Sequence, residues 1–520
     1  MRTGVLRVGL SLGRFVPGPD QVMVPPETIT RQTPYGEIHR LAPQVKLFQD
    51  AGPVARSAGG CARWRPGPLA GLSAIMGTFP IRAHGVRAVL LSCSLLLGSA
   101  QALAAEPAAV PAASVSDTAA PSESDKPRFP NLLDSTLTPG GELAEEDAPK
   151  SSLFRRPTEL EPWFDWKRQF RKDYGLNIGG SMMVLWQNYS SSRIGQDNAV
   201  GGKFTLNLSY DLLNRGSPNA LSFDMAVEQR GPLGTDLPPL QAGFGAGSLI
   251  PTAATYGQFD MGITQAYIRQ SLDDNRFQYT IGKVFAPNFI DAYPFFDDNR
   301  QFLSQAFSTS PTIASPLRGF GAVAAAFPTD GGLYVMPGVF TNHSSDVGST
   351  VEDFFTKNER FYMLEVGLSG LAGKGVPIQA RGPTDANNIH LTGWYRDATQ
   401  DTGQPRSYGV AFNANQQVDD NIMWFLRAGW SEGWAADRAV SAGFGWRPSQ
   451  AFSDLFGFGI GWTHPASSFL ESQYTAEAFY RFHVTPNFAI TPDIQLQLHP
   501  ALNPAENALW VFSLRARLVF

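Results

Sequence analysis

The sequence predicts an all-β fold: a transmembrane antiparallel β-barrel of about 16 strands with a short N-terminal periplasmic helix. First, alternating apolar and polar residues recur in segments that are mostly 9–12 residues long. Strands of soluble sheets average about 5–6 residues, whereas tilted membrane strands need about 9–11. Second, tight and long connections alternate between the segments, as in barrels with short periplasmic turns and long outer loops. Third, aromatic residues gather at segment ends, which is typical of interfacial girdles.

The composition argues against a helical membrane protein and against a disulfide scaffold. The mean hydropathy is only −0.15, and no apolar run reaches the roughly 20 residues that a spanning helix needs. The chain has two cysteines, Cys61 and Cys93, and both precede the predicted barrel. The barrel region therefore offers neither a disulfide framework nor a cysteine-based metal site.

The N-terminal part predicts an exported protein. Residues 76–104 have the pattern of a signal peptide: a basic start, the apolar core Ala88–Gly98 and the A-x-A site Ala102–Ala104. A faint lipoprotein box ends at Cys93, but the apolar core continues past it, which favours an ordinary signal. We expect residues 1–75 to be a non-native upstream extension from a start assigned too early. Without residues 1–104 the chain is more acidic than its full-length net charge of −5, so we expect no nucleic-acid partner.

Between the signal and the barrel we expect a linker and a helix. Residues 105–160 are rich in Ala, Pro and acids and predict a disordered linker. In residues 161–175 aromatic side chains recur every three or four positions, which predicts a short amphipathic helix. Residues 176–520 would then form the barrel, whose first strand is predicted to begin near residue 174. The predicted strands lie near 174–187, 202–211, 220–230, 258–270, 276–285, 318–328, 331–341, 361–369, 387–397, 406–415, 420–431, 438–447, 454–463, 473–484, 487–498 and 508–520.

The alternation alone does not say which face of the strands points outward. An even number of about sixteen strands would make a barrel too wide for its own side chains to fill. An open sheet of that size would leave two unpaired edges, and closure removes them. We therefore expect the apolar faces to meet lipid and the polar faces to line a water-filled lumen.

The predicted inward rows carry charges of both signs, amides and an aromatic ring. Such a mixture suits neutral polyhydroxylated solutes, because charged groups bond hydroxyls and rings cover the apolar faces of a sugar. An alternative is that the arginines brace the wall by pairing with Glu477 or Asp493. The predicted lumen-facing residues are Glu228, Trp394, Arg396, Arg427, Glu477, Arg481, His483, Asp493, Gln495, Gln497, Arg515 and Arg517.

Three blocks resemble the carbohydrate-selective porins of the OprB type. They are GKVFAPNFIDAYPFFDDNRQFLSQAF (282–307), the last 45 residues (476–520) with their Thr-Pro-Asp-Ile-Gln strand and Arg-x-Arg ending, and WFDWKRQFRKDYGLNIGG from Trp163. The block that begins at Trp163 has Lys167-Arg168 where the family usually has two glycines. The resemblance spans about 163–520.

The resemblance implies a sixteen-stranded channel in the bacterial outer membrane for passive, sugar-preferring diffusion of small hydrophilic solutes into the periplasm. Lys283 and the loop that follows it would lie at or near the constriction. The partners it implies are small carbohydrates, outer-membrane lipid, and assembly machinery that reads the last strand at Phe520. The sequence leaves open whether the chain is a monomer or a homotrimer. The loop residues expected there are Asp291, Asp297, Asp298, Asn299 and Arg300.

Two alternatives to a sugar channel are a porin for other solutes and a barrel enzyme. A porin for other small solutes, such as organic acids, fits the same barrel pattern. A barrel enzyme would need Ser, His and an acid on one patch, but the histidines after residue 104 are scattered, and no G-x-S-x-G or H-E-x-x-H motif occurs. We therefore expect no catalytic residues, no cofactor and no metal.

Overall fold

The computed structural model describes residues 28–33, 36–41, 129–215, 217, 219–370, 387–419, 421–449 and 451–520. The chain divides into two units, Met1–Lys126 and Pro127–Phe520. In the first unit β1 (Thr28–Thr33) and β2 (Gly36–Leu41) pair as an antiparallel hairpin. The signal peptide expected at 76–104 lies outside the described residues.

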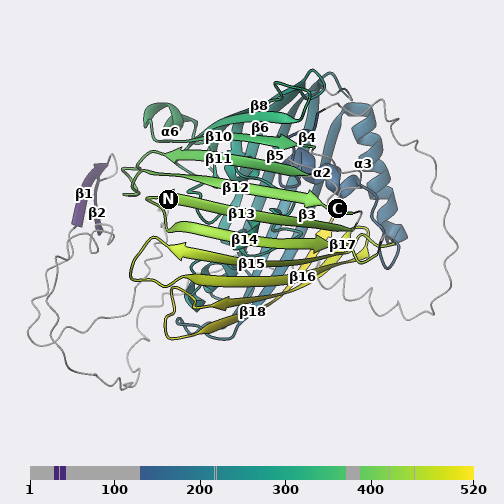
Figure 1. Ribbon diagram of the computed structural model, residues 1–520. Coiled ribbons are helices and arrows are strands. Elements are labelled where there is room, and N and C mark those ends of the chain that lie inside the picture. The colour runs from purple at the N-terminus through teal and green to yellow at the C-terminus, as the bar shows by residue number, and fades with distance from the viewer. Residues whose placement is uncertain are drawn as a thin grey trace, which may run out of the picture. The chain divides into compact units, whose positions relative to one another are not determined.

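The second unit is built on a closed antiparallel barrel of sixteen strands, β3 to β18, each paired with its neighbours in sequence (Figure 1). This confirms the predicted fold class, and every predicted strand overlaps one observed strand. The strands are β3 (Leu176–Tyr189), β4 (Asn198–Leu213), β5 (Leu221–Pro232), β6 (Phe259–Leu272), β7 (Phe277–Phe285), β8 (Arg318–Ala326), β9 (Leu333–Thr341), β10 (Arg360–Ser369), β11 (Asn388–Arg396), β12 (Ser407–Gln417), β13 (Ile422–Glu432), β14 (Ala436–Trp446), β15 (Leu455–Pro465), β16 (Gln473–Thr485), β17 (Phe488–Leu498) and β18 (Ala508–Val519).

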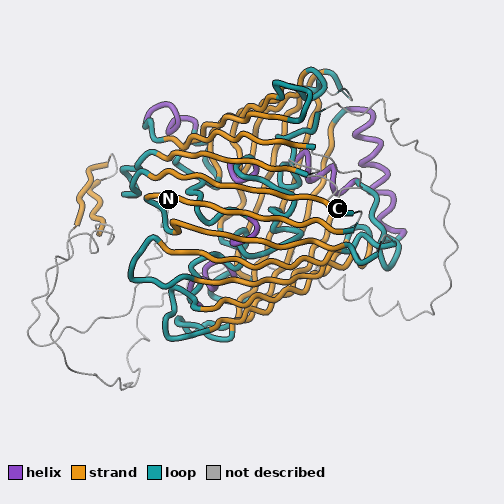
Figure 2. The backbone as a smooth tube through the Cα atoms, viewed as in Figure 1, coloured by secondary structure: helices purple, strands orange, loops and turns teal. Residues whose placement is uncertain are grey.

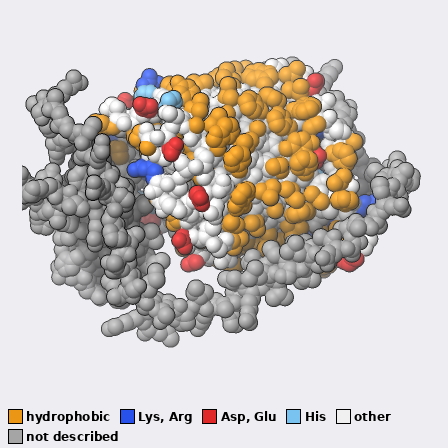
Figure 3. Space-filling view, turned by 90° about the horizontal axis from the view of Figure 1, so that it is seen from below, with side chains coloured by type: hydrophobic (Ala, Val, Ile, Leu, Met, Phe, Trp, Pro, Cys, Tyr) orange, Lys and Arg blue, Asp and Glu red, His pale blue; other side chains and the backbone are white. Residues whose placement is uncertain are grey.

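The period of two places apolar side chains on the outside of the wall. On β18, Trp510 and Leu514 are 40% and 46% exposed, whereas Ser513 and Arg515 between and after them are 5% and 1% exposed. Figure 3 shows the result as a broad band of hydrophobic side chains that few charged groups interrupt. The predicted orientation of the faces is therefore correct.

The barrel closes where the last strand meets the first. The pairing of β18 with β3 runs from Val511↔Tyr189 to Val519↔Ser181. Beyond it, Phe520 N donates to Gly180 O at 2.9 Å, and Gly180 N donates to Phe520 O at 3.0 Å. The Phe520 ring also stacks on Phe204 of β4, with centroids 6.3 Å apart.

The two ends of the barrel differ, as predicted. Long connections leave one end, here called the loop end; the longest are 233–258, 286–317 and 342–359. The opposite end, here called the turn end, has short turns such as 486–487 and carries the C-terminus. Its exception is the connection 370–387, most of which lies outside the described residues.

Short helices accompany the barrel, and the described part of the chain contains no helix long and apolar enough to cross a membrane. The helix predicted at 161–175 is α3, which lies at the turn end beside the C-terminus (Figures 1 and 2). It ends at Gly175, whose φ of 73° suits glycine. The helices are α2 (Pro139–Asp147), η3 (Thr158–Leu160), α3 (Glu161–Tyr174), α4 (Pro239–Ala246), η4 (Ala286–Asn288), α5 (Gln305–Ser308) and α6 (Val351–Thr356).

The disordered linker expected at 105–160 needs correction from residue 129 onward. There the chain is folded: it includes α2, and Leu132, Leu133 and Leu143 are 2%, 2% and 0% exposed. The composition predicts disorder because the isolated segment cannot bury its few apolar side chains by itself. The barrel supplies the missing surface, because the segment lies inside the lumen. Residues 105–128 lie outside the described residues.

The closing pair supports a prediction about assembly. Replacing Phe520 by Ala removes the ring that stacks on Phe204 at the seam. We expect the free energy of unfolding in detergent, measured by urea titration, to fall by about 1 kcal/mol, with a lower yield of assembled barrel. Phe469→Ala makes the same change at an 86% exposed loop position and should have no effect. Equal behaviour of the two variants would contradict a stabilising seam.

Candidate functional site

Three segments fold into the barrel and fill its lumen. They are residues 129–147, the loop 233–258 with α4, and the loop 286–317 with η4 and α5. The last loop is buried almost throughout; Phe295 and Phe302, for example, are 0% exposed and pack on Phe425 of the wall. A sixteen-stranded wall is too wide for its own side chains to fill, so these segments take that space.

Polar wall residues hold the loop 286–317 on one side of the barrel. The carboxylate of Glu477 accepts the backbone N–H groups of Leu303 at 2.5 Å and Ser304 at 3.0 Å. The guanidinium of Arg515 donates to the carbonyl oxygens of Asp298 at 2.7 Å and Gln301 at 2.9 Å. These two side chains satisfy loop backbone groups that would otherwise be buried without partners.

Asp291 anchors the opposite side of the same loop. Its carboxylate pairs with Arg427 and with His390, whose Nε2 lies 3.0 Å away. Burial alone would raise the pKa of Asp291, but Arg427 and His390 outweigh it and lower that pKa. Asp291 therefore stays charged, and the loop is fixed between β11 and β13.

A cluster of buried charged side chains on the inner wall surrounds Glu228 of β5. Arg230 Nε donates to its carboxylate at 2.9 Å, and Thr264 donates to it at 3.0 Å. Lys203 of β4 and Arg318 of β8 lie 3.9 Å and 4.0 Å from the same carboxylate. We call Lys203, Glu228, Arg230 and Arg318 the constriction. Asp346 pairs with Arg318 at 2.9 Å, so acids offset much of the positive charge.

Aromatic rings and unused polar atoms complete the constriction. The guanidinium groups of Arg230 and Arg318 each lie 5.1 Å from the ring centre of Phe259. Lys203 Nζ donates to Asn299 of the loop 286–317 at 2.9 Å. The buried Nε of Arg318 and hydroxyl of Thr205 have no hydrogen-bond partner among the described residues. Charged donors, a carboxylate and ring faces thus stand together.

The cavity beside the constriction is small. Its volume is about 20 Å³, which is enough for about one water molecule. Its walls come from the barrel, from the loop 286–317 and from the N-terminal segment. The lining residues include Leu137, Glu142, Lys203, Glu228, Arg230 and Asn299.

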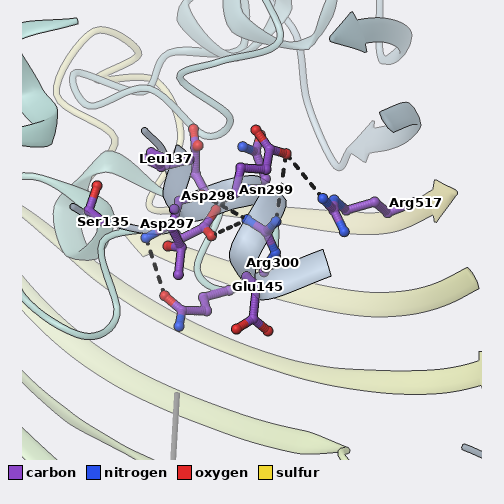
Figure 4. Close-up of polar contacts among 12 residues, drawn as sticks. Ser135, Leu137, Glu145, Asp297, Asp298, Asn299, Arg300 and Arg517 are labelled. Carbon is purple, nitrogen blue, oxygen red and sulfur yellow. Dashed lines mark hydrogen bonds and ion pairs between the residues drawn. The ribbon is translucent and has the colours of Figure 1, made fainter. Parts of the chain in front are cut away.

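Glu142 and Glu146 of α2 tie the N-terminal segment to the wall and to the loop. Figure 4 shows the wall residue Arg517 and the loop residues Asp297 and Arg300 at this site. Arg517 Nη2 donates to Glu142 at 3.1 Å and to Glu146 at 2.8 Å. Arg300 lies 3.6 Å from Glu142 and donates to Asp297 at 2.6 Å. Burial raises the pKa of Glu146 to about 7, and this effect outweighs the opposing charge of Arg517.

The structure groups the predicted residues by the segment they contact. Glu228 and Asn299 lie at the constriction, and Lys283 lies near it, donating to Ile263 O and Asp346 O. Arg427, Glu477 and Arg515 hold the loop 286–317, and Arg517 holds the N-terminal segment.

The other predicted residues make local contacts. Asp297 pairs with Arg300, Trp394 stacks on Phe361, and Arg396 lies over Trp434. Arg481, Asp493 and Gln495 are buried on the inner faces of β16 and β17. Their contact with a solute stays a prediction.

Sequence reasoning missed Lys203, Arg230 and Arg318. A usable signal existed, since Lys203 and Arg230 share the inward register of Thr205 and Glu228 on their strands. Arg318 begins a predicted strand. Glu142 and Glu146 had no such signal, because the surrounding composition resembles that of a disordered segment.

A closed barrel with an apolar outer band and a polar lumen narrowed by inward-folded loops defines a porin-type channel. A family model described as the carbohydrate-selective porin, OprB family, matches residues 195–520. The chain belongs to this family.

One solved structure supports the fold. The high-pH structure of Pseudomonas putida OprB is 15% identical to this chain, with a TM-score of 0.56, and the match covers 72% of this chain and 99% of that one. The low-pH structure of the same protein is 14% identical, covers 72% and 100%, and has a TM-score of 0.43. A mutant porin of Rh. blastica is 11% identical, covers 66% and 100%, and has a TM-score of 0.42. A search of curated protein sequences found no match.

The constriction predicts how ion selectivity depends on Glu228. Glu228→Gln removes the carboxylate that faces three cations, so the potential at this point becomes more positive. We expect the reversal potential in a salt gradient to shift toward anion selectivity. Glu432→Gln, at the exposed end of β13, is the control and should leave it unchanged. A shift of equal size in both variants would contradict a local effect at the constriction.

The raised pKa of Glu146 predicts a pH dependence of stability. The folded protein binds this proton more tightly than the unfolded chain, whose pKa is near 4.5. The favourable contribution is therefore complete below about pH 4.5 and is lost as the pH rises through about 7. The charged groups around Glu146 are Arg517, Glu142, Arg300 and Lys167. Urea unfolding of the wild type between pH 5 and 8 should show this loss, and Glu146→Gln should flatten it; equal slopes would contradict the assignment.

Proposed function

We propose that this chain is an outer-membrane channel for passive, sugar-preferring diffusion of small hydrophilic solutes into the periplasm. The observation that carries the proposal is the constriction, where charged donors, one carboxylate and ring faces meet inside a barrel of the OprB family. The barrel and the family indicate a channel rather than an enzyme.

The chemistry of the constriction suits a neutral sugar. Glu228 can accept hydroxyl protons, Arg230, Arg318 and Lys203 can donate to hydroxyl oxygens, and Phe259 can cover an apolar sugar face. Because most of these groups already bond one another, a sugar exchanges existing bonds for new ones and gains little. Weak binding of this kind permits passage as well as selection.

The family and the fold support a proposal for the location and the partners of the protein. The OprB family and the barrel imply the outer membrane. We further propose export through residues 76–104, with the turn end and Phe520 in the periplasm and the loop end outside. Assembly machinery would read the last strand, lipid would cover the apolar band, and a homotrimer would be the assembled form.

Sugar preference is tested by liposome swelling and by sugar block of the ion current. Glucose should enter faster than a size-matched organic acid; entry no faster than the acid would contradict the proposal and favour a porin for organic acids. Arg230→Ala removes a donor and should raise the half-blocking glucose concentration about tenfold. Arg438→Ala, whose side chain is 51% exposed on β14, is the control and should leave the block unchanged. An unchanged block in Arg230→Ala would remove that residue from the solute path.

A further inference from the structure

Residues 129–147 enter the lumen at the turn end. Phe129 N donates to Asp274 O of the β6–β7 turn at 3.2 Å, and the Phe129 ring stacks on Phe327, with centroids 4.9 Å apart. Leu132 N donates to the side chain of Gln278 on β7 at 2.8 Å. The segment is thus fixed against the inner wall at its point of entry.

The middle of the segment crosses the lumen beneath the loop 286–317. The carbonyl oxygen of Leu137 accepts from Asn288 at 3.1 Å and from Gln265 at 3.4 Å. Thr136 O accepts from Arg300 at 3.2 Å. Ser135 and Thr136 are 0% and 4% exposed, so protein surrounds these two side chains.

The helix α2 then leads back to the turn end. Glu142 bonds Arg517 on β18 at 3.1 Å and Asn207 on β4 at 2.9 Å, so it bridges two parts of the wall. At the end of the helix, Asp147 accepts from Arg171 of α3 and from Asn177 of β3, both at 3.2 Å. Residues 129–147 thus enter and leave the lumen at the turn end, opposite the long loops.

This placement obstructs the path beyond the constriction. Leu137 and Glu142 line the same small cavity as Lys203 and Glu228. A solute that passes the constriction therefore meets the segment before it reaches the turn end. Space for about one water molecule does not admit a hexose.

Many contacts of the segment are hydrogen bonds and ion pairs, which water can replace. At its point of entry, Phe129, Leu132 and Leu133 also pack in a hydrophobic cluster with the wall. Several buried polar atoms in these contacts have no hydrogen-bond partner among the described residues: Ser135 Oγ, Glu145 Oε2, Glu146 Oε2 and Arg517 Nε. Unmet groups make the docked state costly, because water would satisfy them. The segment also lies outside the matched family region 195–520.

We propose that residues 129–147 are a plug that closes the lumen from the turn end, and that solute passes only when the plug leaves its place. The inference rests on the proposed channel function and adds regulation to it. Glu142 and Glu146 are the residues that hold the plug to Arg517.

Charge removal tests the hold on the plug. Glu142→Gln weakens the bonds of the plug to Arg517 and Arg300, and we expect the open fraction in planar bilayers to rise at least about tenfold, which corresponds to about 1.4 kcal/mol. Glu159→Gln makes the same change at an exposed position and should change nothing. An unchanged open fraction in the first variant would overturn the plug.

A chemical probe follows the plug directly, even where conductance is ambiguous. Ser135→Cys is placed in a chain whose Cys61 and Cys93 are replaced by Ser. A small water-soluble thiol reagent should modify it on the timescale of sugar passage, and at least about tenfold faster with Glu142→Gln added. Sugar flux with no modification of this cysteine would overturn the proposal.

Deletion of residues 129–147 separates the plug from the channel function. A large rise in flux with retained preference for glucose over the organic acid supports both proposals. A rise without preference supports the plug and contradicts sugar selectivity. Unchanged flux with retained preference overturns the plug alone. If the deleted chain does not assemble, the charge variants and the thiol probe decide.

Discussion

The structure depends on one constraint: within lipid, every backbone hydrogen bond of the sheet must be made inside the protein. The pairing of β18 with β3 meets it, and the exchange of bonds between Phe520 and Gly180 completes the ring. Sixteen strands closed in this way enclose more space than their own side chains can fill. The inward loops and the N-terminal segment follow from that surplus, and so do the charges that hold them.

Charged side chains on the inner wall act mainly as anchors in this conformation. Glu477 and Arg515 bind the backbone of the loop 286–317, Arg427 fixes its Asp291, and Arg517 holds α2. Removing one partner of a buried pair is costly because the other charge remains unpaired. These buried ion pairs and hydrogen bonds therefore set the width of the lumen and the position of the constriction. Neighbouring residues thus brace the structure and select the solute.

The sequence was most informative for strands that have lipid on one face and polar protein on the other. Lipid outside and polar protein inside impose a period of two, so even the last strand was located to within a residue at its ends. The interior was less predictable, because contacts such as Arg515 with the loop 286–317 join distant residues that no local pattern connects. Residues 129–147 show the limit most clearly: their composition predicts disorder alone, and only the barrel gives them buried partners.

A structure of the protein with a bound monosaccharide would locate both the selective site and residues 129–147. We expect the sugar to lie between Glu228, Arg230 and Lys203, with residues 129–147 displaced from the lumen. A sugar bound away from the constriction would contradict the assignment of the selective site. A sugar seated there while residues 129–147 keep their contacts with Arg517 would contradict the plug.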